Sequence, residues 1–537
     1  MADQPIARHI PVQYDERGNP TWRTVMSPSD NSYGKCYMVP DRVIPVIFVP
    51  GVMGSNLIER GTDPKDAIRW RLDSRASVGV WAFNGPKKRK RYLHPEVMEV
   101  DRDGAVPDDA MLPAEELRRR GWGEIAALSY QDILMWLEKH LNDFDNCRDS
   151  HRLLVADLDL KAMKGEQCPT RDEIGLTFRY RFPVYACGYN WLASNADSAQ
   201  RLSDRIDEVI RRYRAEKKKV EKVIIITHSM GGLVGRCCSE VLGRRKDIMG
   251  IVHGVMPAIG AAAVYRRFKS GTEGDFGTSA TLGGNAAAMT AVLSTAPGPM
   301  QLLPSAKYGN GWLKIKDAGN IYALPQHGDP YSEIYTVRRK WWSMCEDQLI
   351  NPLNEERDTR NRLRQLDRDW NAFEKTIHEP VRRFHEDISD RYHPNTYAFF
   401  GSSDKHRAYG TVTWQGDGGG WLRGGRGADV LNARALDSEE IHTDRTVAAP
   451  LEGTGWLKGE HQTYTISEPD EAGDGTVPHR SGIAPQYACR SLMNVPVEHE
   501  PAFKPGENSH NMRAAHFTLR AIVHIAQDVK NTSLRYD

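Results

Sequence analysis

One serine of this chain lies where a strand pattern changes into a helix pattern. The stretch KVIIITHSMGGLVGR, residues 222–236, contains four consecutive apolar β-branched residues at 223–226, then Ser229 three positions later, then two glycines at 231 and 232. The β-branched run is typical of a strand buried in a parallel sheet, and the apolar residues after Ser229 recur at helical spacing. A sharp turn between them would expose the serine hydroxyl beside the positive end of a helix. This is the G-x-S-x-G layout of a nucleophilic serine, with Thr227 in place of the first glycine. The alternative is an ordinary turn with a capping serine.

A serine hydroxyl needs a neighbouring base, usually a histidine that a carboxylate holds in place. Chains with this serine turn carry the three residues in the order Ser, Asp or Glu, His. Asp474 in GDGTVP lies between glycines, so a tight turn would present its carboxylate beyond a strand end. His499 follows the strand pattern at 491–497, where the last strand should bring the base to the sheet edge. We predict a triad of Ser229, Asp474 and His499, with His510 as the rival base.

Acyl transfer also requires N–H donors that stabilise the negative charge on the carbonyl oxygen. One donor is expected from Met230, the residue after the nucleophile, and another from the loop after an earlier strand. The segment VPGVMGS fits that loop, because Gly51 lets the chain turn close and the N–H of Val52 can then face Ser229. The alternative is that the Pro-Gly pair only ends a strand. His228 is badly placed to be the base, and we expect it to pack or hydrogen-bond beside the serine.

Strand and helix patterns alternate in the first half of the chain, which predicts an α/β fold with a mainly parallel central sheet. The strand patterns cover residues 42–50, 180–191, 223–226, 248–256, 395–401, 410–414 and 491–497, and the clearest helix patterns cover 196–213 and about 515–528. The strands of the predicted sheet therefore come from two separate parts of the sequence. The insertion between them is expected at the carboxyl edge of the strands, where ligands bind in open α/β sheets.

We predict an N-terminal arm at 1–41, a catalytic core formed by 42–265 and 395–537, and a large, partly helical cap at 266–394. An apolar stripe at helical spacing lies in the cap: Trp370, Phe373, Ile377, Val381, Phe384 and Ile388. Pro380 is expected to kink this helix. The favoured interpretation of 338–393 is a helical hairpin that packs on its neighbours. The alternative is a lid or membrane-facing helix over an active site.

The composition of the chain argues against several classes of function. The 537 residues carry a net charge of +1, so nothing global indicates nucleic-acid binding. The basic run at 87–91 is expected to be a solvated loop, with phospholipid head-group or phosphate binding as the alternative. Eight cysteines lack C-x-x-C spacing, and we predict no metal and no cofactor. No secretory signal pattern is visible, and no stretch reaches the about 20 apolar residues of a spanning helix, so we expect a chain made in the cytoplasm.

Several motifs together resemble a known family. VPGVMGSNL, GYNW, THSMGG, GDGTVP and the histidine loop near the end are similar to the α/β-hydrolase branch that contains lecithin:cholesterol acyltransferase and lysosomal phospholipase A2. GYNWLASN and the C-terminal region from VEHEPAFK to FTLRAIVHIA are more similar to bacterial lipases that act as type VI secretion effectors. The resemblance implies an α/β-hydrolase fold, with Ser229 as nucleophile, Asp474 as acid and Val52 at the oxyanion hole. It places the base between the last strand and the last helix, which covers both His499 and His510.

The resemblance implies a serine lipase or phospholipase that hydrolyses carboxylic esters of lipids at a phospholipid surface through an acyl-enzyme. It also implies an antibacterial effector that type VI secretion delivers to the periplasm of target cells. An immunity protein and a component of the secretion spike would then be its partners. One alternative is a cytoplasmic carboxylesterase or acyltransferase on small acyl substrates. Another is a catalytically inactive hydrolase scaffold that binds a partner protein.

Overall fold

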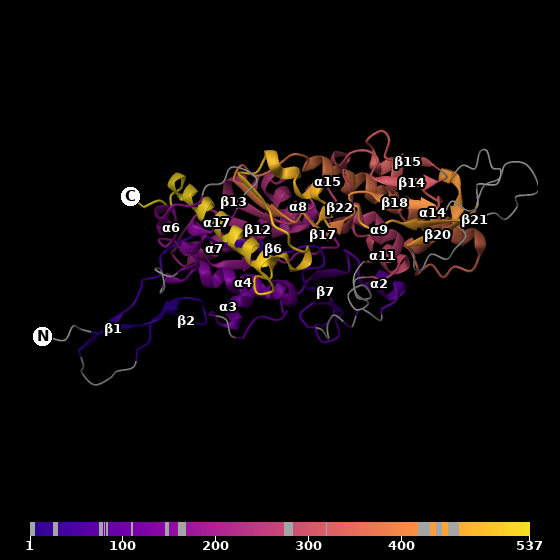
Figure 1. The fold of residues 1–537 in the computed structure, drawn as a ribbon. Helices are drawn as coiled ribbons and strands as arrows, with labels where there is room; N and C mark the ends of the chain where they lie inside the picture. The colour runs from indigo at the N-terminus through magenta and orange to yellow at the C-terminus, as the bar shows by residue number, and fades with distance from the viewer. Residues whose placement is uncertain are drawn as a thin grey trace, which may run out of the picture.

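A parallel sheet forms the centre of the computed structural model (Figure 1). The structure describes residues 6–24, 31–74, 79, 81, 84–108, 111–144, 150–158, 160, 168–272, 283–317, 319–416, 430–435, 443–448 and 461–536. Within these residues the sheet has six strands in the order β10-β6-β12-β13-β16-β23, all parallel to their neighbours. Their bounds are β6 Val46–Val49, β10 Val184–Ala186, β12 Val223–His228, β13 Ile248–Gly254, β16 Thr396–Phe400 and β23 Ser491–Asn494. The predicted α/β fold and the split of its sheet are thereby confirmed.

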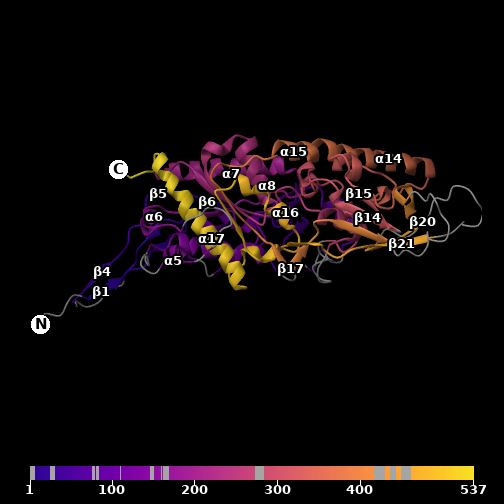
Figure 2. The same ribbon diagram turned by 45° about the horizontal axis from the view of Figure 1, so that its top comes forward.

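Helices cover both faces of this sheet. Ile47, Ile225 and Ile251 belong to the core on one face, together with α7 Asn195–Ala215 and α8 Gly231–Arg236. Phe48, Ile226 and Val252 belong to the core on the other face, together with α4 Ala127–Leu141 and α17 Ser509–Ala526. Figures 1 and 2 show α17 running diagonally across the sheet. Burial on both faces explains why these strands consist of continuous apolar runs.

A second sheet lies beside the first, with the order β15-β14-β18-β21-β20-β19 in the described part of the chain. Its strands are β14 Leu313–Asp317, β15 Asn320–Leu324, β18 Val412–Gly416, β19 Arg434–Ala435, β20 Asp444–Ala448 and β21 His461–Ile466. The pattern at 410–414 predicts a strand of the central sheet, and this is wrong. It forms β18, which pairs with β14 and places Trp414 against Trp341, with ring centroids 5.3 Å apart. The domain limits at 265 and 395 stay a prediction.

The helices of the insertion pack beside both sheets. They are α9 Ala263–Ser270, α11 Ala286–Leu293, α12 Pro297–Met300, α13 Asp347–Ile350, α14 Thr359–Thr376, the π-helical turn η7 Ile377–Val381 and α15 Arg382–Asp387. The predicted apolar stripe on α14, η7 and α15 is buried as expected. These three segments form one continuous helical run along an edge of the molecule (Figure 2), so the expected hairpin is wrong. Pro380 lies in η7, where the irregular turn accommodates its missing N–H.

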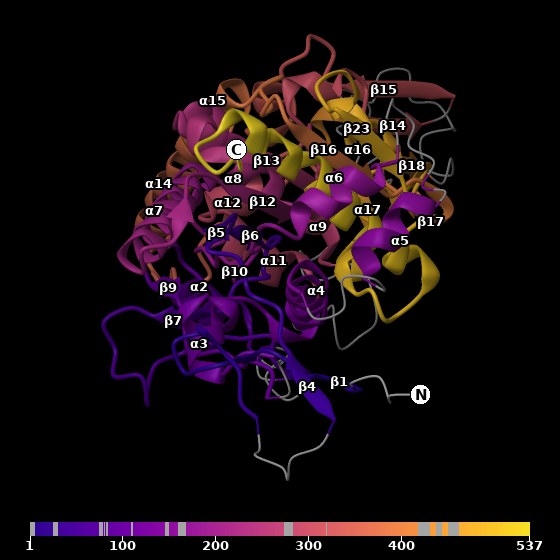
Figure 3. The same cartoon turned by 90° about the vertical axis from the view of Figure 1, so that its left-hand side faces the viewer.

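Shorter elements complete the described chain. The strands are β1 Ile6–His9, β2 Gln13–Tyr14, β3 Pro20–Thr21, β4 Ser32–Lys35, β5 Arg42–Val43, β7 Leu57–Glu59, β8 Arg69–Trp70, β9 Met98–Val100, β11 Lys219–Val220, β17 Ser403–Ala408 and β22 Glu471–Gly473. The helices include α2 Pro86–Tyr92, α3 Ala114–Arg119, α5 His151–Asp157, α6 Arg171–Thr177 and α16 His479–Gly482. Strands β1 and β4 extend away from the body (Figures 1 and 3). Among the helices described, none combines the length and the apolar character needed to cross a membrane.

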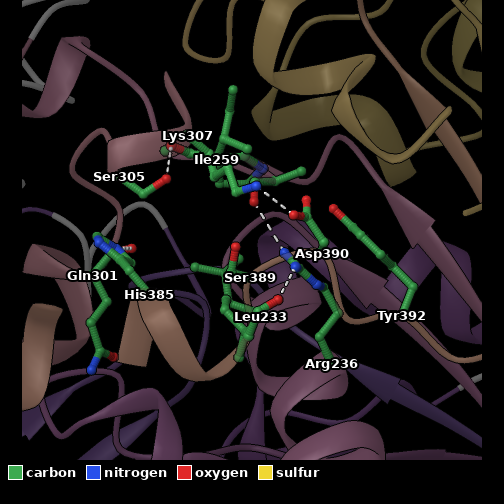
Figure 4. Close-up of a pocket in the computed structure, with 14 residues that line it drawn as sticks. Leu233, Arg236, Ile259, Gln301, Ser305, Lys307, His385, Ser389, Asp390 and Tyr392 are labelled. Atoms are coloured by element: carbon green, nitrogen blue, oxygen red, sulfur yellow. Dashed lines mark hydrogen bonds and ion pairs between the residues drawn. The ribbon is translucent and has the colours of Figure 1, made fainter. Parts of the chain in front are cut away.

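Arg236, the last residue of α8, joins the helix after Ser229 to the end of α15 (Figure 4). Its buried guanidinium donates to the carbonyl oxygens of Arg391 at 3.0 Å, Ala258 at 3.0 Å and Ile388. The group also lies 4.0 Å from the centre of the Tyr392 ring. Burial lowers the pKa of Arg236. These carbonyl groups compensate the buried cation and tie the insertion to the core.

We expect Arg236→Met to lower the free energy of unfolding by about 3 kcal/mol, because buried carbonyl groups lose their donors. The matched control is Arg382→Met, since Arg382 is 40% exposed and pairs with Asp329 and Glu386 at the surface. The control should change the free energy by less than about 1 kcal/mol. Urea unfolding curves measure both values. Equal losses in the two variants would contradict a clamping role for Arg236.

Candidate active site

Ser229 lies in a sharp turn directly after β12, as the sequence predicts. Its backbone has φ = 51°, a left-handed conformation that is uncommon for a residue with a side chain. The N–H of Ser229 donates to the carbonyl oxygen of Gly254 at 3.0 Å, and its own carbonyl oxygen accepts from the N–H of Gly232 at 2.9 Å. These bonds hold the turn between β12 and α8. The serine side chain therefore stands at the carboxyl edge of the sheet.

Thr227 occupies the place where the G-x-S-x-G pattern has its first glycine. The compensating glycine lies in α8, because a Cβ at Gly235 would come within 3.1 Å of Thr227 Cγ2. The Thr227 hydroxyl lies 2.7 Å from Nδ1 of His253 in β13 and so has a hydrogen-bond partner inside the sheet. A threonine is thus accommodated at this position without displacing the helix.

The structure brings Ser229, His499 and Asp474 together in one hydrogen-bonded row. His499 Nε2 lies 2.8 Å from Ser229 Oγ, and His499 Nδ1 lies 2.8 Å from Asp474 Oδ2. Because an ionised carboxylate only accepts, Nδ1 donates to Asp474 and Nε2 is left to accept from the serine hydroxyl. The rival His510 is instead an exposed residue in the first turn of α17, where its N–H bonds the Asn508 side chain.

Backbone groups fix the carboxylate of Asp474 in its turn after β22. Oδ1 accepts from the N–H of Thr476 at 2.9 Å and from the N–H of Val477 at 2.6 Å, which leaves Oδ2 for His499. The N–H of His499 also donates to the carbonyl oxygen of Asp474 at 2.9 Å. Asp474 is 2% exposed, so water does not compete for the carboxylate.

The loop after β6 passes directly against the serine. A Cβ at Gly51 would lie 2.9 Å from His228 Nδ1 and 3.1 Å from Ser229 Cβ, so glycine permits this close approach. Val52, the next residue, lines the same cavity as Ser229. Met230 directly follows the serine and is the N-cap residue of α8. The two backbone segments predicted to form an oxyanion hole therefore flank Ser229.

Tyr130 is a buried site residue that the sequence did not indicate. It lies in the first turn of α4, and its hydroxyl oxygen accepts from the N–H of Gly51 at 3.0 Å. The same oxygen is 2.8 Å from Nδ1 of His228, whose Nε2 is 2.9 Å from the carbonyl oxygen of His499. His228 thus hydrogen-bonds beside the serine, as expected.

A cavity of about 740 Å³ opens beside Ser229 and His499. One part of its lining is apolar and comes from the segments around α9, α11 and α12: Ala261, Val264, Met289, Leu293, Pro299 and Leu302. Another part is polar: Ser129, Arg267, Thr476, Glu498, Glu500, Lys504 and Glu507. A ligand with an apolar tail and a polar end would match both parts. No group of three His, Cys, Asp or Glu side chains suited to a metal ion occurs among the described residues.

Two buried histidines next to the serine turn should make stability depend on pH. Burial lowers the pKa of His228 to about 4 and that of His253 to about 3, below the value of about 6.5 in an unfolded chain. The unfolded state then binds more protons, so the free energy of unfolding falls as the pH falls below about 6.5. The expected loss is about 2 kcal/mol per histidine between about pH 7 and pH 5.

Chemical unfolding of wild type and His253→Asn at several pH values measures this dependence. The variant should show a shallower loss of stability in acid, whereas His510→Asn, a change at an exposed histidine, should match wild type. The same pH dependence in all three proteins would contradict the assignment.

Comparisons with known proteins agree with this geometry. The family described as PGAP1-like alpha/beta domain matches residues 181–264, which include β12, the serine turn and β13. A chain from "The crystal structure of Tle4-Tli4 complex" is 28% identical, with a TM-score of 0.71, and the match covers 90% of this chain and 98% of that chain. A comparison with curated proteins gives no match.

These similarities bear on the predicted resemblance. They confirm the α/β-hydrolase fold and the similarity to type VI secretion lipase effectors, whereas the link to the branch of lecithin:cholesterol acyltransferase stays a prediction. By fold, serine turn and structural similarity, this chain has the α/β-hydrolase fold and is similar to a type VI secretion lipase effector.

Proposed function

We propose that this chain is a serine lipase or phospholipase that hydrolyses carboxylic ester bonds of membrane lipids. The observation that carries the proposal is the row of hydrogen bonds from Asp474 through His499 to Ser229, in the wall of a partly apolar cavity. A nucleophile, a base and a group that orients the base, all within hydrogen-bond reach, are the arrangement that acyl transfer requires.

In the proposed reaction, Ser229 Oγ attacks the ester carbonyl carbon while His499 Nε2 takes the hydroxyl proton. Asp474 holds the imidazole in position and stabilises its positive charge. The N–H groups of Val52 and Met230 stabilise the oxyanion of the tetrahedral intermediate. His499 then gives the proton to the leaving alcohol oxygen, and an acyl-enzyme remains. A water molecule, deprotonated by His499, attacks this ester and releases the fatty acid and free Ser229.

The cavity supports a lipid rather than a small acyl substrate. Its volume of about 740 Å³ is within the range of sites that enclose a large ligand. The apolar residues of α9 and α11 would bind the acyl chain, and the polar residues around His499 would face the head group. The insertion that carries α9 and α11 would then act as a cap over the substrate.

The similarity to the Tle4 chain supports a role as a type VI secretion effector. That chain was solved in a complex with Tli4, which supports an immunity protein as a partner of this chain as well. Delivery to the periplasm of target cells and contact with the secretion spike belong to the same proposal.

Four proteins tested on phospholipid vesicles would check the triad: wild type, Ser229→Ala, His499→Ala and His510→Ala. Release of fatty acid should fall at least about 10³-fold in the first two variants, because nucleophile and base act as a unit. His510→Ala should retain activity within about twofold, because removing an exposed side chain leaves this unit intact. If His510→Ala lost activity and His499→Ala retained it, His510 rather than His499 would be the base. A wild type that hydrolyses neither vesicles nor short p-nitrophenyl esters would contradict the proposed function.

Leu293 in α11 offers a test of the acyl-chain site. It is buried and lines the cavity, so Leu293→Trp should fill part of the apolar volume. Hydrolysis of esters with long acyl chains should fall at least about tenfold, while esters of two to four carbons, about the length that stays beside Ser229, should keep their rate within about twofold. The ratio of the two kcat/KM values measures the effect. Equal losses on short and long chains would exclude this part of the cavity as the acyl site.

A further inference from the structure

Tyr130 and His228 connect the loop after β6 to the backbone of the triad histidine. The connection is a run of three hydrogen bonds: Gly51 N to Tyr130 Oη at 3.0 Å, Tyr130 Oη to His228 Nδ1 at 2.8 Å, and His228 Nε2 to the carbonyl oxygen of His499 at 2.9 Å. Tyr130 is 3% exposed and His228 is 4% exposed. Water therefore has little access to replace any member of the run.

The donors and acceptors in these groups allow only one direction of hydrogen-bond donation along the run. A carbonyl oxygen only accepts, so His228 must carry its proton on Nε2 to bond His499. Its Nδ1 then has a free lone pair and accepts from the Tyr130 hydroxyl. The Tyr130 oxygen in turn accepts from the N–H of Gly51. Burial lowers the pKa of His228 and raises that of Tyr130, so both side chains are neutral at pH 7.

The two segments that the run connects come from distant strands of the sheet. Gly51 follows β6, and His499 comes from the loop after β23, while β12, β13 and β16 lie between those two strands. Pairing within the sheet therefore does not fix the position of one loop relative to the other. The side chains of Tyr130 and His228 bridge them directly at the carboxyl edge.

Tyr130 is itself held in place. Its ring centroid lies 5.2 Å from that of Phe48 in β6, and a Cβ at Gly54 would come within 2.8 Å of the Tyr130 ring. The hydroxyl is thus presented from a fixed ring on α4. A fixed donor is what a positioning group requires.

We infer that Tyr130 and His228 form a positioning relay. The relay holds the proposed oxyanion loop after β6 and the proposed base His499 in fixed positions relative to one another. The inference rests on the proposed function for its effect on catalysis. Neither side chain transfers a proton in the reaction. The relay acts through the positions of the Val52 N–H group and the His499 ring relative to the reacting carbonyl.

Kinetics on a soluble short-chain ester test the relay. Tyr130→Phe keeps the ring and removes only the hydroxyl, and it should lower kcat at least about tenfold with KM within about twofold, because misplaced donors affect the transition state more than binding. The matched control is Tyr189→Phe. Tyr189 Oη donates to the carbonyl oxygen of Pro50 at 2.8 Å, on the same loop but outside the relay. This control should lower kcat by less than about threefold. Equal effects of the two variants on kcat would overturn the inference.

A double-mutant cycle separates a relay from general loosening of the site. His228→Gln retains a donor near the position of Nε2 but loses the acceptor for Tyr130. Adding Tyr130→Phe to His228→Gln should therefore lower kcat by less than about twofold further, whereas Tyr189→Phe should add its full effect. If the fold-loss of kcat in the double variant equalled the product of the losses in Tyr130→Phe and His228→Gln, the inference would be overturned. Melting temperatures of all variants show whether each remains folded.

Nuclear magnetic resonance tests the relay without any substrate. In protein labelled with ¹⁵N-histidine, His228, assigned by its absence in His228→Gln, should be the neutral Nε2–H tautomer at pH 7. Its Nδ1 resonance should move in Tyr130→Phe and stay in Tyr189→Phe. A charged ring or an Nδ1–H tautomer would overturn the relay. If wild type hydrolysed no ester, the proposed function would fail, and this spectrum alone would support or overturn the relay.

Discussion

The close approach of two backbones at the serine turn is the constraint on which the site depends. A Cβ at Gly231 would lie 2.5 Å from the carbonyl oxygens of both Val49 and Pro50, so α8 begins in direct contact with the end of β6. Gly51 allows the same closeness on the other side of Ser229. With no side chains between them, Ser229 and the loop after β6 share one edge of the sheet. His499, Asp474 and the cavity are all arranged around Ser229 at that edge.

The insertion supplies what the central sheet lacks. The sheet places reactive groups at its edge, but the apolar wall of the cavity comes from residues near α9, α11 and α12. Arg236 links the end of α15 to α8, so the segment after Ser229 and the insertion are fastened to one another by buried hydrogen bonds. A fixed insertion keeps the shape of the cavity constant, as a site that must position a long flexible ligand requires.

Local motifs made much of the site predictable. Two glycines follow Ser229 closely and Asp474 lies between two glycines, and such turns are visible in a sequence. His499 and His510 both lie between the last strand and the last helix, so only the path of the chain separates them. β23 ends at Asn494, and the following loop brings the His499 N–H to Asp474, whereas His510 has already entered α17.

Other features depend on long-range packing that no local pattern carries. Tyr130 contacts His228, which lies 98 residues away in the sequence. Because Tyr130 belongs to an ordinary amphipathic helix, its local sequence does not indicate a role in the site. The sequence of the strand at 412–416 indicates a strand, but its partner β14 decides to which sheet it belongs. The expected hairpin fails because Pro380 lies in a π-helical turn, where a proline does not interrupt the helix.

The separation of the triad along the chain has a consequence for synthesis. Ser229 and His499 are 270 residues apart, and the whole insertion lies between them. A chain emerging from the ribosome therefore carries Ser229, the proposed nucleophile, long before His499, the proposed base, has been translated. Under the proposed mechanism, Ser229 gains its base only after the segment that contains β23 has been translated and β23 has paired with β16. The order of these residues along the chain thus delays assembly of the proposed triad until His499 has been translated.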